Sequence, residues 1–81
     1  MTPIHELLHR IRHDLDFADA RFELGYYDRL EDEIIRIGLA DLRQSEGAFS
    51  IQDEQGRWQT VPLHRVRRVW RNEELIWSRD P

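Results

Sequence analysis

The sequence predicts a single α+β domain over residues 1–81, with one N-terminal helix packed on a mostly antiparallel sheet of five or six strands and a short helical turn near residue 62. Three observations predict it. A chain of 81 residues is of ordinary single-domain size. Apolar residues recur at helical spacing near the N-terminus, whereas later segments alternate with period two. Cysteine is absent, so packing must stabilise the domain without disulfides or thiolate-bound zinc.

The first element is a helix over about residues 3–14. Thr2 followed by Pro3 is typical of an N-cap and a first helical position. Apolar residues then recur at helical spacing: Ile4, Leu7, Leu8, Ile11 and Leu15. We expect this stripe to face the sheet. The short acidic segment that follows, residues 14–20, is expected to be a loop.

Two strands are expected to form a hairpin after that loop. The first covers residues 21–28, where apolar and polar residues alternate. The second covers residues 34–37, which are mostly β-branched, and the acidic segment 30–33 forms the turn. Gly25 in the middle of the first strand indicates a bulge or a close approach of another backbone.

The second half of the chain is expected to be built mainly from short strands. Its least regular segment is 38–47, where a helical turn through 39–42 is one interpretation. The segment 62–71 fits both periodicities, and we interpret it as a helical turn followed by a strand, because Pro62 suits a first helical position. The expected elements are strands at 49–51 and 58–61 around a turn at 53–56, a helical turn at 62–66, a strand at 67–71, a turn at 72–74 and a strand at 75–77.

Charge is unevenly distributed along the chain. Residues 1–56 carry a net charge of −7, residues 57–79 carry +4, and the whole chain carries −4. The basic C-terminal part predicts a local anionic partner. A chain that is acidic overall should not coat nucleic acid non-specifically, so an anion site here should be small and defined. All twelve cations are arginine, which suits phosphate binding but also follows from a GC-rich genome.

Several functional classes lack their sequence signatures. The N-terminus has no basic region followed by a long apolar run, and no apolar stretch approaches the roughly 20 residues of a transmembrane helix. We therefore expect a cytoplasmic protein with no membrane association. No nucleophile elbow, phosphate-binding glycine loop or pair of metal-binding carboxylates occurs. The sequence thus predicts a non-catalytic protein without a cofactor or metal.

The first candidate site is a row of histidines on the predicted helix. His5, His9 and His13 lie four residues apart, so they form one stripe, and a histidine pair at this spacing can chelate a divalent metal. This is the basis for one alternative function, a metal-dependent enzyme. The other interpretation is a solvated helix face, which the neighbouring Glu6 and Arg10 favour.

The second candidate site is the basic segment that begins at His64. His64 and Arg65 can together grip a phosphate, because a guanidinium is a two-pronged donor and an imidazole donates when protonated. Arg67, Arg68 and the interleaved Trp70 resemble the pattern of single-strand RNA recognition. Two alternatives remain: the arginines are exposed strand residues paired with the acidic half, or they dock an acidic protein partner.

The third candidate site lies at the end of the first predicted strand. Asp28 and Arg29 can hold a loop together. In the functional interpretation, Arg29 and a tyrosine hydroxyl point into the same site as His64, and the ring of Tyr26 or Tyr27 stacks on a base. Period-two alternation places Tyr26 on the apolar face, half in the core.

These residues form separated blocks that resemble one known family. The blocks are Leu7-Leu8-x-Arg10-Ile11-x-x-Asp14, Tyr26-x-Asp28-Arg29, Pro62-x-His64-Arg65 and Leu75-Ile76-Trp77-x-Arg79. In this order and spacing they resemble the RNA cyclic-group end recognition domain family. The chain departs from the family pattern at His13, where tryptophan is usual, and at residues 72–74, which lack the usual glycine.

The resemblance implies a non-catalytic module that binds an RNA 3′ end, including ends that carry a 2′,3′-cyclic phosphate, in RNA repair or processing. It also implies an RNA-processing protein as a partner. The residues expected to contact RNA or phosphate are Tyr26, Tyr27, Asp28, Arg29, His64, Arg65, Arg68 and Arg79. This hypothesis requires the segments around Arg29 and His64 to meet in space.

Overall fold

A computed structural model describes residues 3–13 and 20–79 of the chain. Within them there is one α-helix, and seven strands form two antiparallel sheets. The elements are α1 (Ile4–His13), β1 (Phe22–Asp28), β2 (Glu33–Gly38), the 3-10 turn η2 (Leu39–Asp41), β3 (Leu42–Ser45), β4 (Ala48–Gln52), β5 (Trp58–Pro62), the 3-10 turn η3 (Leu63–Arg65), β6 (Val66–Arg71) and β7 (Glu74–Ser78). The larger sheet has the strand order β2-β1-β6-β7 and the smaller has the order β3-β4-β5.

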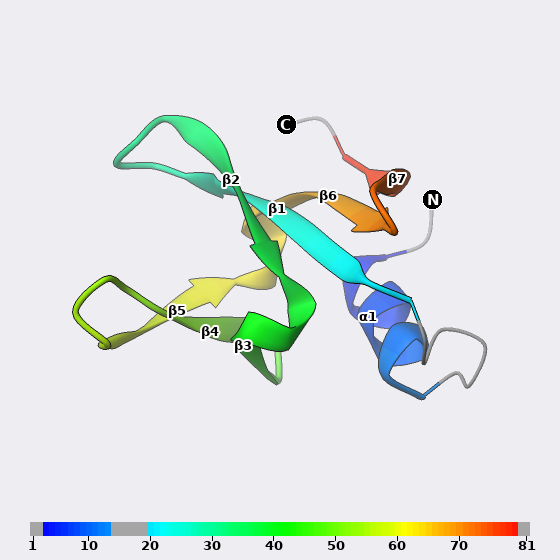
Figure 1. Cartoon of the computed structure of the whole chain (residues 1–81), viewed down its shortest axis with the longest axis horizontal. Helices are drawn as coiled ribbons and strands as arrows, with labels where there is room; N and C mark the ends of the chain where they lie inside the picture. Colours follow the sequence, from blue (N-terminus) through cyan, green and yellow to red (C-terminus); the bar gives the residue numbers. More distant parts are fainter. Residues whose placement is uncertain (1–2, 14–19, 80–81) are drawn as a thin grey trace.

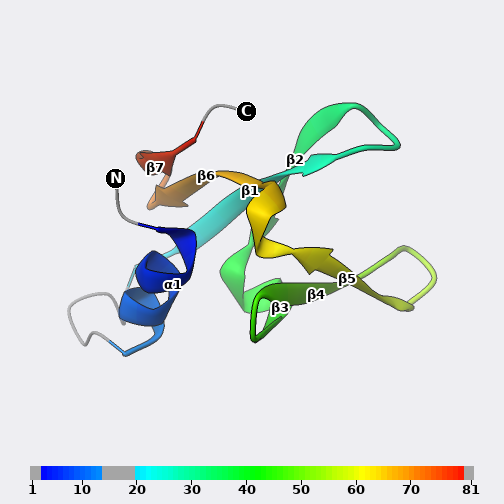
Figure 2. The same cartoon turned by 180° about the vertical axis from the view of Figure 1, so that it is seen from behind.

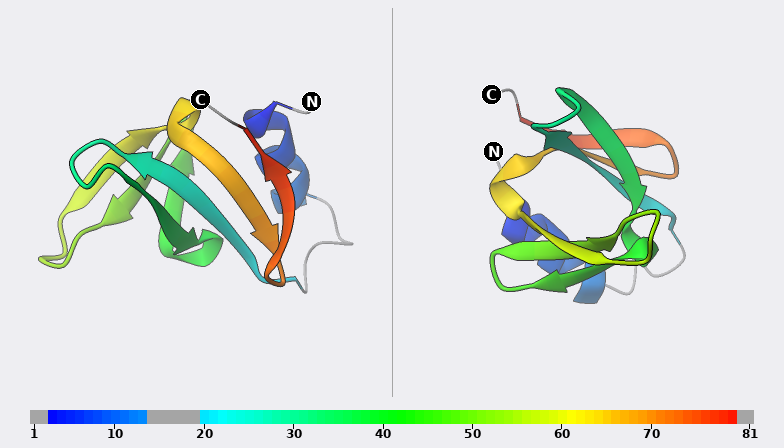
Figure 3. Two further views of the ribbon diagram at one scale, coloured as in Figure 1. Left: turned by 90° about the horizontal axis from the view of Figure 1, so that it is seen from above. Right: turned by 90° about the vertical axis from the view of Figure 1, so that its left-hand side faces the viewer.

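The domain has two layers. The four-stranded sheet forms one layer, and α1 and the three-stranded sheet lie side by side against one of its faces (Figures 1 and 2). Figure 3 shows the two sheets facing each other across the interior. The two 3-10 turns make the crossings between the sheets, because η2 leads from β2 into β3 and η3 leads from β5 into β6.

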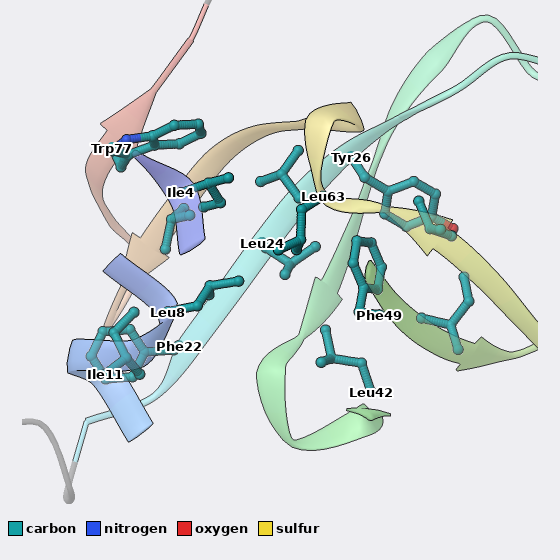
Figure 4. Close-up of a cluster of buried hydrophobic side chains, with 14 residues drawn as sticks. Ile4, Leu8, Ile11, Phe22, Leu24, Tyr26, Leu42, Phe49, Leu63 and Trp77 are labelled. Carbon is teal, nitrogen blue, oxygen red and sulfur yellow. The ribbon is translucent and has the colours of Figure 1, made fainter. Parts of the chain in front are cut away.

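The core lies between these layers, and β1 connects its two halves. Phe22, Leu24 and Tyr26 alternate along β1 and all point inward. Figure 4 shows that Phe22 lies beside α1 and that Tyr26 lies beside Phe49 of the small sheet, where the two rings meet edge to face at 5.6 Å. Burying each of these large side chains contributes about 2 kcal/mol. The buried residues are Ile4, Leu8, Ile11, Phe22, Leu24, Tyr26, Leu42, Phe49, Ile51, Val61, Leu63, Val66, Val69 and Trp77.

The predicted helix is confirmed, with its apolar stripe against the sheet. Ile4, Leu8 and Ile11 are buried, and the helix begins where the carbonyl of Pro3 accepts the first backbone N–H groups at 3.1 Å. The predicted N-cap Thr2, the end of the stripe at Leu15 and nearly all of the predicted loop fall outside the described residues. No helix in the described part of the chain is long and apolar enough to span a bilayer.

The α+β class is confirmed, but the strands are arranged differently from the prediction. The prediction of one sheet with five or six strands is corrected to seven strands in two sheets. The additional strand is β3, whose short sequence has a single buried residue, Leu42, and therefore no visible alternation. The helical turn predicted near residue 62 is η3, and the turn considered at 39–42 is η2.

Candidate functional site

The end of β1 and the start of β6 lie side by side, so the two segments singled out in the sequence do meet. Tyr26 is opposite Val66 in the antiparallel register of the two strands. Since η3 immediately precedes Val66, its residues lie next to the turn that follows β1. Figure 3 (left) shows η3 at the same end of the large sheet as the β1–β2 hairpin.

A β-bulge in β6 shapes this corner. Gly25 is opposite Arg68 and Tyr26 is opposite Val66, so Arg67 is an extra residue without a direct partner on β1. The bulge allows Val66 and Val69 to be fully buried although they are three residues apart. Bulges re-aim side chains next to functional sites, and here the bulged residue is an arginine.

Two arginines converge on the backbone of η3. Nη1 of Arg67 donates to the carbonyl oxygen of His64 at 2.6 Å, and Nη2 of Arg79 donates to the same oxygen at 2.5 Å. Arg79 also donates to the carbonyl of Val66 at 3.0 Å, and its guanidinium lies 5.5 Å from the ring centre of Trp77. Both guanidinium groups are therefore fixed in place, while the imidazole of His64 is on the surface.

Arg67 and Arg79 bring two positive charges to one backbone carbonyl oxygen. Two guanidinium groups that share one acceptor repel each other, and a carboxylate would normally compensate them. Among the described residues, the ion pair is between Arg36 and Glu23, at 2.9 Å, and it does not include Arg67 or Arg79. Both guanidinium groups therefore lack a carboxylate partner among the described residues.

Tyr27 adds an aromatic ring and a hydroxyl group to the corner. Its hydroxyl donates to the carboxylate of Asp32 in the β1–β2 turn. This hydrogen bond, with burial and the charge of Asp32, raises the pKa of Tyr27, while the positive charges of Arg29 and Arg67 act in the opposite direction. Both arginines therefore lie close enough to the phenol to influence it. We call Arg29, Arg67 and Arg79, together with Tyr27 and His64, the arginine cluster.

Comparison with known families identifies the family of the chain. The family described as the MJ1316 RNA cyclic group end recognition domain matches residues 1–79. The chain belongs to this family. No curated protein and no solved structure shows a significant match to it.

Two residues in the blocks that suggested this end-recognition family have internal roles. The ring of Tyr26 is buried, and burial, with a smaller effect of Asp28, raises the pKa of its hydroxyl. The carboxylate of Asp28 accepts the backbone N–H groups of Leu30 at 2.9 Å and Glu31 at 3.4 Å, so it holds the β1–β2 turn. Tyr27 is consequently the tyrosine with a ring available for stacking.

Two other predicted residues of the end-recognition domain lie beside the cluster without joining it. Arg65 is half-buried in η3, and Arg68 is half-buried in β6 opposite Gly25. Neither side chain forms a hydrogen bond or ion pair with another of the described residues. Their role in RNA binding stays a prediction.

Arg67 was noted in the basic segment that begins at His64, but it was not among the residues expected to contact RNA. Its guanidinium nevertheless donates to the backbone of η3, whereas the side chains of Arg65 and Arg68 do not. One pattern could have found it. Val66 and Val69 are both typical core residues, yet their spacing does not fit a strand of period two. An extra residue between them is the simplest solution in a strand, and a bulge would then present Arg67 differently from its neighbours.

The helix histidines lie elsewhere in the domain. His5, His9 and His13 are exposed, and the rings of His9 and His13 are 4.4 Å apart. No group of three or more His, Cys, Asp or Glu side chains placed to hold a metal is found within residues 3–13 and 20–79. A hollow of about 500 Å³ near the helix lies at the other end of β1 from the arginine cluster. It is lined by Ile11, Arg12, Ala20, Arg21, Phe22, Glu23, Gly38, Leu39, Ala40 and Asp41.

The turn that lacks the family's usual glycine adopts a conformation that glycine would favour. Asn72 and Glu73 have φ values of 48° and 72°. Asn72 compensates by bonding to the chain beside β1: its side-chain oxygen accepts the N–H of Arg21 at 2.8 Å, and its own N–H donates to the carbonyl of Arg21 at 2.7 Å. Asparagine tolerates this region of φ better than most residues.

Proposed function

We propose that this domain binds the 3′ end of RNA and holds its terminal 2′,3′-cyclic phosphate in the arginine cluster, without catalysing a reaction. One observation carries the proposal. Arg67 and Arg79 are both fixed on the carbonyl oxygen of His64, and neither has a carboxylate partner among the described residues. An anion placed between them would relieve the repulsion of the two cations.

The cluster has the donors that a phosphate needs. Each guanidinium keeps N–H groups that are not used by the His64 carbonyl, and these form a planar fork that matches two phosphate oxygens. Because the protein backbone already fixes both groups, binding would cost little side-chain entropy. Arg29 and the exposed imidazole of His64 would complete the ring of donors.

The terminal nucleotide would stack on Tyr27. Its ring lies on the outer face of the hairpin, half-exposed, and its hydroxyl is held by Asp32. A base can stack on such a ring whatever its identity, since every base has a π face. The terminal sugar would then lie between this ring and the guanidinium groups.

The charge of the chain favours an end over a long RNA. The whole chain carries −4, and the β1–β2 turn next to Tyr27 contains Glu31 and Asp32. These charges oppose extended contact with a phosphate backbone. A cyclic phosphate carries one negative charge, which a few fixed cations can balance.

The test is a fluorescence-polarisation titration with a short labelled RNA that ends either in a 2′,3′-cyclic phosphate or in hydroxyl groups. The cyclic end should bind more tightly, with a shallow salt dependence of about −0.7 in log–log slope per phosphate contacted. Arg67→Gln and Arg29→Gln should each remove most of the difference between the two ends. Arg57→Gln is the matched control, because Arg57 is an exposed arginine in the β4–β5 turn.

Two results would overturn the proposal. Equal affinity for the two RNA ends would remove end recognition. Stronger binding of an acidic peptide than of RNA, lost in Arg67→Gln, would assign the cluster to a protein partner instead. The absence of catalysis is tested on the same samples, because the cyclic phosphate should be recovered intact after incubation with the protein.

A further inference from the structure

A second aromatic and cationic site lies on the small sheet, at the start of β5. Trp58 exposes 43% of its surface, although tryptophan is among the largest apolar side chains. The guanidinium of Arg43, on β3, lies 4.2 Å from the centre of its ring. An arginine in this position covers one face of the indole and leaves the rest of the ring to solvent or to a ligand.

The surface beside this pair is hollowed. The hollow has a volume of about 430 Å³, within the range of small-ligand sites. Four segments of the chain contribute to it: the end of β2, the turn η2 with the beginning of β3, the end of β4 and the beginning of β5. The lining residues are Ile37, Ala40, Asp41, Leu42, Arg43, Gln52 and Trp58.

The polar groups of the hollow indicate the chemistry of a ligand. The carboxylate of Asp41 has no hydrogen bond or ion pair with another of the described residues, so it remains available as an acceptor; its Oδ2 lies close to Gly38. The amide nitrogen of Gln52 donates to the carbonyl of Gly56 at 3.0 Å, which orients the amide. A free carboxylate repels phosphate, and it favours a ligand edge with adjacent N–H donors.

We propose that this hollow binds a guanine base, stacked against Trp58 with its N–H edge on the carboxylate of Asp41. Guanine presents two neighbouring donors, N1–H and the N2 amino group, which a carboxylate can accept together. Adenine and the pyrimidines lack such a pair. Indole supplies the planar apolar surface that the base needs, and Arg43 fixes the orientation of the indole.

The guanine would belong to the RNA whose end lies in the arginine cluster, and in this respect the inference rests on the proposed function. Strand β5 runs from Trp58 to Pro62 and continues directly into η3 with His64. The four steps of β5 span about 13 Å, so the base would lie upstream of the terminal nucleotide. Between the two sites, the hydroxyls of Ser50 and Thr60 lie 3.4 Å apart and offer polar contacts to the sugar-phosphate chain.

The first test uses uridine-rich RNAs that all end in a 2′,3′-cyclic phosphate and carry one guanine or one adenine at successive positions. At one upstream position, guanine should raise affinity about tenfold over adenine. Asp41→Asn should abolish this preference for guanine without changing the preference for a cyclic end. Trp58→Ala should lower affinity for the guanine-containing and the adenine-containing RNAs alike, because it removes the stacking surface. Arg36→Gln is the control, because Arg36 stacks on Trp70 and does not line this hollow. This variant should keep the preference for guanine.

The second test separates this inference from the proposed function. It maps amide chemical shifts on adding guanosine 5′-monophosphate, with adenosine 5′-monophosphate as the reference. Guanine-specific shifts at Asp41, Arg43 and Trp58 would support the site even if RNA ends were not distinguished. Unchanged shifts there, or equal shifts with both nucleotides, would overturn the guanine site and leave end recognition untouched.

Discussion

The two sheets each carry an arginine stacked on a tryptophan at the same distance, yet the surroundings of the two pairs differ. On the large sheet, Arg36 lies 4.2 Å from the ring of Trp70 and also forms an ion pair with Glu23 at 2.9 Å. On the small sheet, Arg43 lies 4.2 Å from the ring of Trp58 and has no acidic partner among the described residues. The arginine of the first pair thus has both a ring and a carboxylate as partners within the domain, whereas the arginine of the second pair has, among the described residues, the ring alone.

The difference extends to the backbone below each pair. Trp70 lies over Gly25, where a β-carbon would be 2.9 Å from the ring, so the indole fills the space that the glycine leaves. Trp58 instead borders a hollow. The same side-chain contact therefore stabilises the sheet in one region and presents a ligand surface in the other, and the neighbours decide which.

Replacing each tryptophan should separate the two roles most strongly. Trp70→Ala should lower the free energy of unfolding by about 3 kcal/mol, because it leaves a cavity over Gly25 and removes the contact with Arg36. Trp58→Ala should lower it by about 1 kcal/mol, since much of that ring is already exposed. Urea denaturation measures both values. A larger loss for Trp58→Ala would invert the comparison.

A side chain at position 25 should cause the next largest decrease in the free energy of unfolding. A β-carbon there would lie 2.8 Å from Cγ2 of Ile34 and 2.9 Å from Trp70, so Gly25→Ala should cost about 2 kcal/mol. Gly38→Ala is the matched control, because its nearest neighbour is the end of the Asp41 side chain, which can move. Thermal unfolding should show a clear decrease for the first variant alone. Equal melting temperatures for the two variants would contradict the close packing of Trp70.

Replacing each arginine should give a smaller difference. Arg36→Gln removes an ion pair and a stacking contact, and should cost about 0.5–1 kcal/mol, with a smaller cost at high salt. Arg43→Gln should cost less, because it removes the stacking contact alone. The comparison requires unfolding curves for both variants at low and high salt. A salt-dependent loss in Arg43→Gln would show that this arginine has an acidic partner after all.

The smallest change in stability should come from a substitution in the β4–β5 turn, which precedes Trp58. The carboxylate of Asp53 accepts the backbone N–H groups of Arg57 and Gln55, each at 2.9 Å, and the side-chain amide of Gln59 at 3.2 Å. The bond from the Arg57 backbone is the main reason that the pKa of Asp53 lies below its ordinary value of 3.8. A lowered pKa stabilises the folded state above the ordinary value, and this contribution is lost as the pH falls through the lowered one.

Asp53→Asn should therefore melt at a lower temperature than the wild type at pH 7, and the difference between the two should shrink as the pH falls below 3.8. Melting curves followed by tryptophan fluorescence at several pH values provide the measurement. A difference that stays constant down to pH 2 would show that the carboxylate charge does not hold this turn.

The local elements of this fold could be predicted because their side chains alternate or recur within a few residues. The helix at 4–13 and the strand at 22–28 each bury one regular face, so periodicity was sufficient. The division into two sheets was not visible, because alternation indicates that a strand has a buried face but not which strand pairs with it. Only the corners at η2 and η3 separate the sheets, and each is three residues long.

The candidate site was predictable to a similar degree. The sequence analysis predicted that the segments around Arg29 and His64 meet in space. In the structure, the register of β1 with β6 places these segments side by side. Arg67 was noted in the basic segment but was not expected to contact RNA, because the bulge that aims this residue depends on the pairing of two distant strands. The sequence analysis also missed the hollow next to Trp58, whose lining comes from four separate segments.

The central claim is that the arginine cluster holds a cyclic phosphate, and amide chemical-shift mapping with uridine 2′,3′-cyclic monophosphate tests it without any second base. We expect concentration-dependent shifts at residues 27–29 and 63–67 and at Arg79, with Arg43 and Trp58 unchanged. Arg67→Gln should weaken the response at all the shifted positions. Shifts confined to other parts of the domain, or none at millimolar nucleotide, would contradict the account.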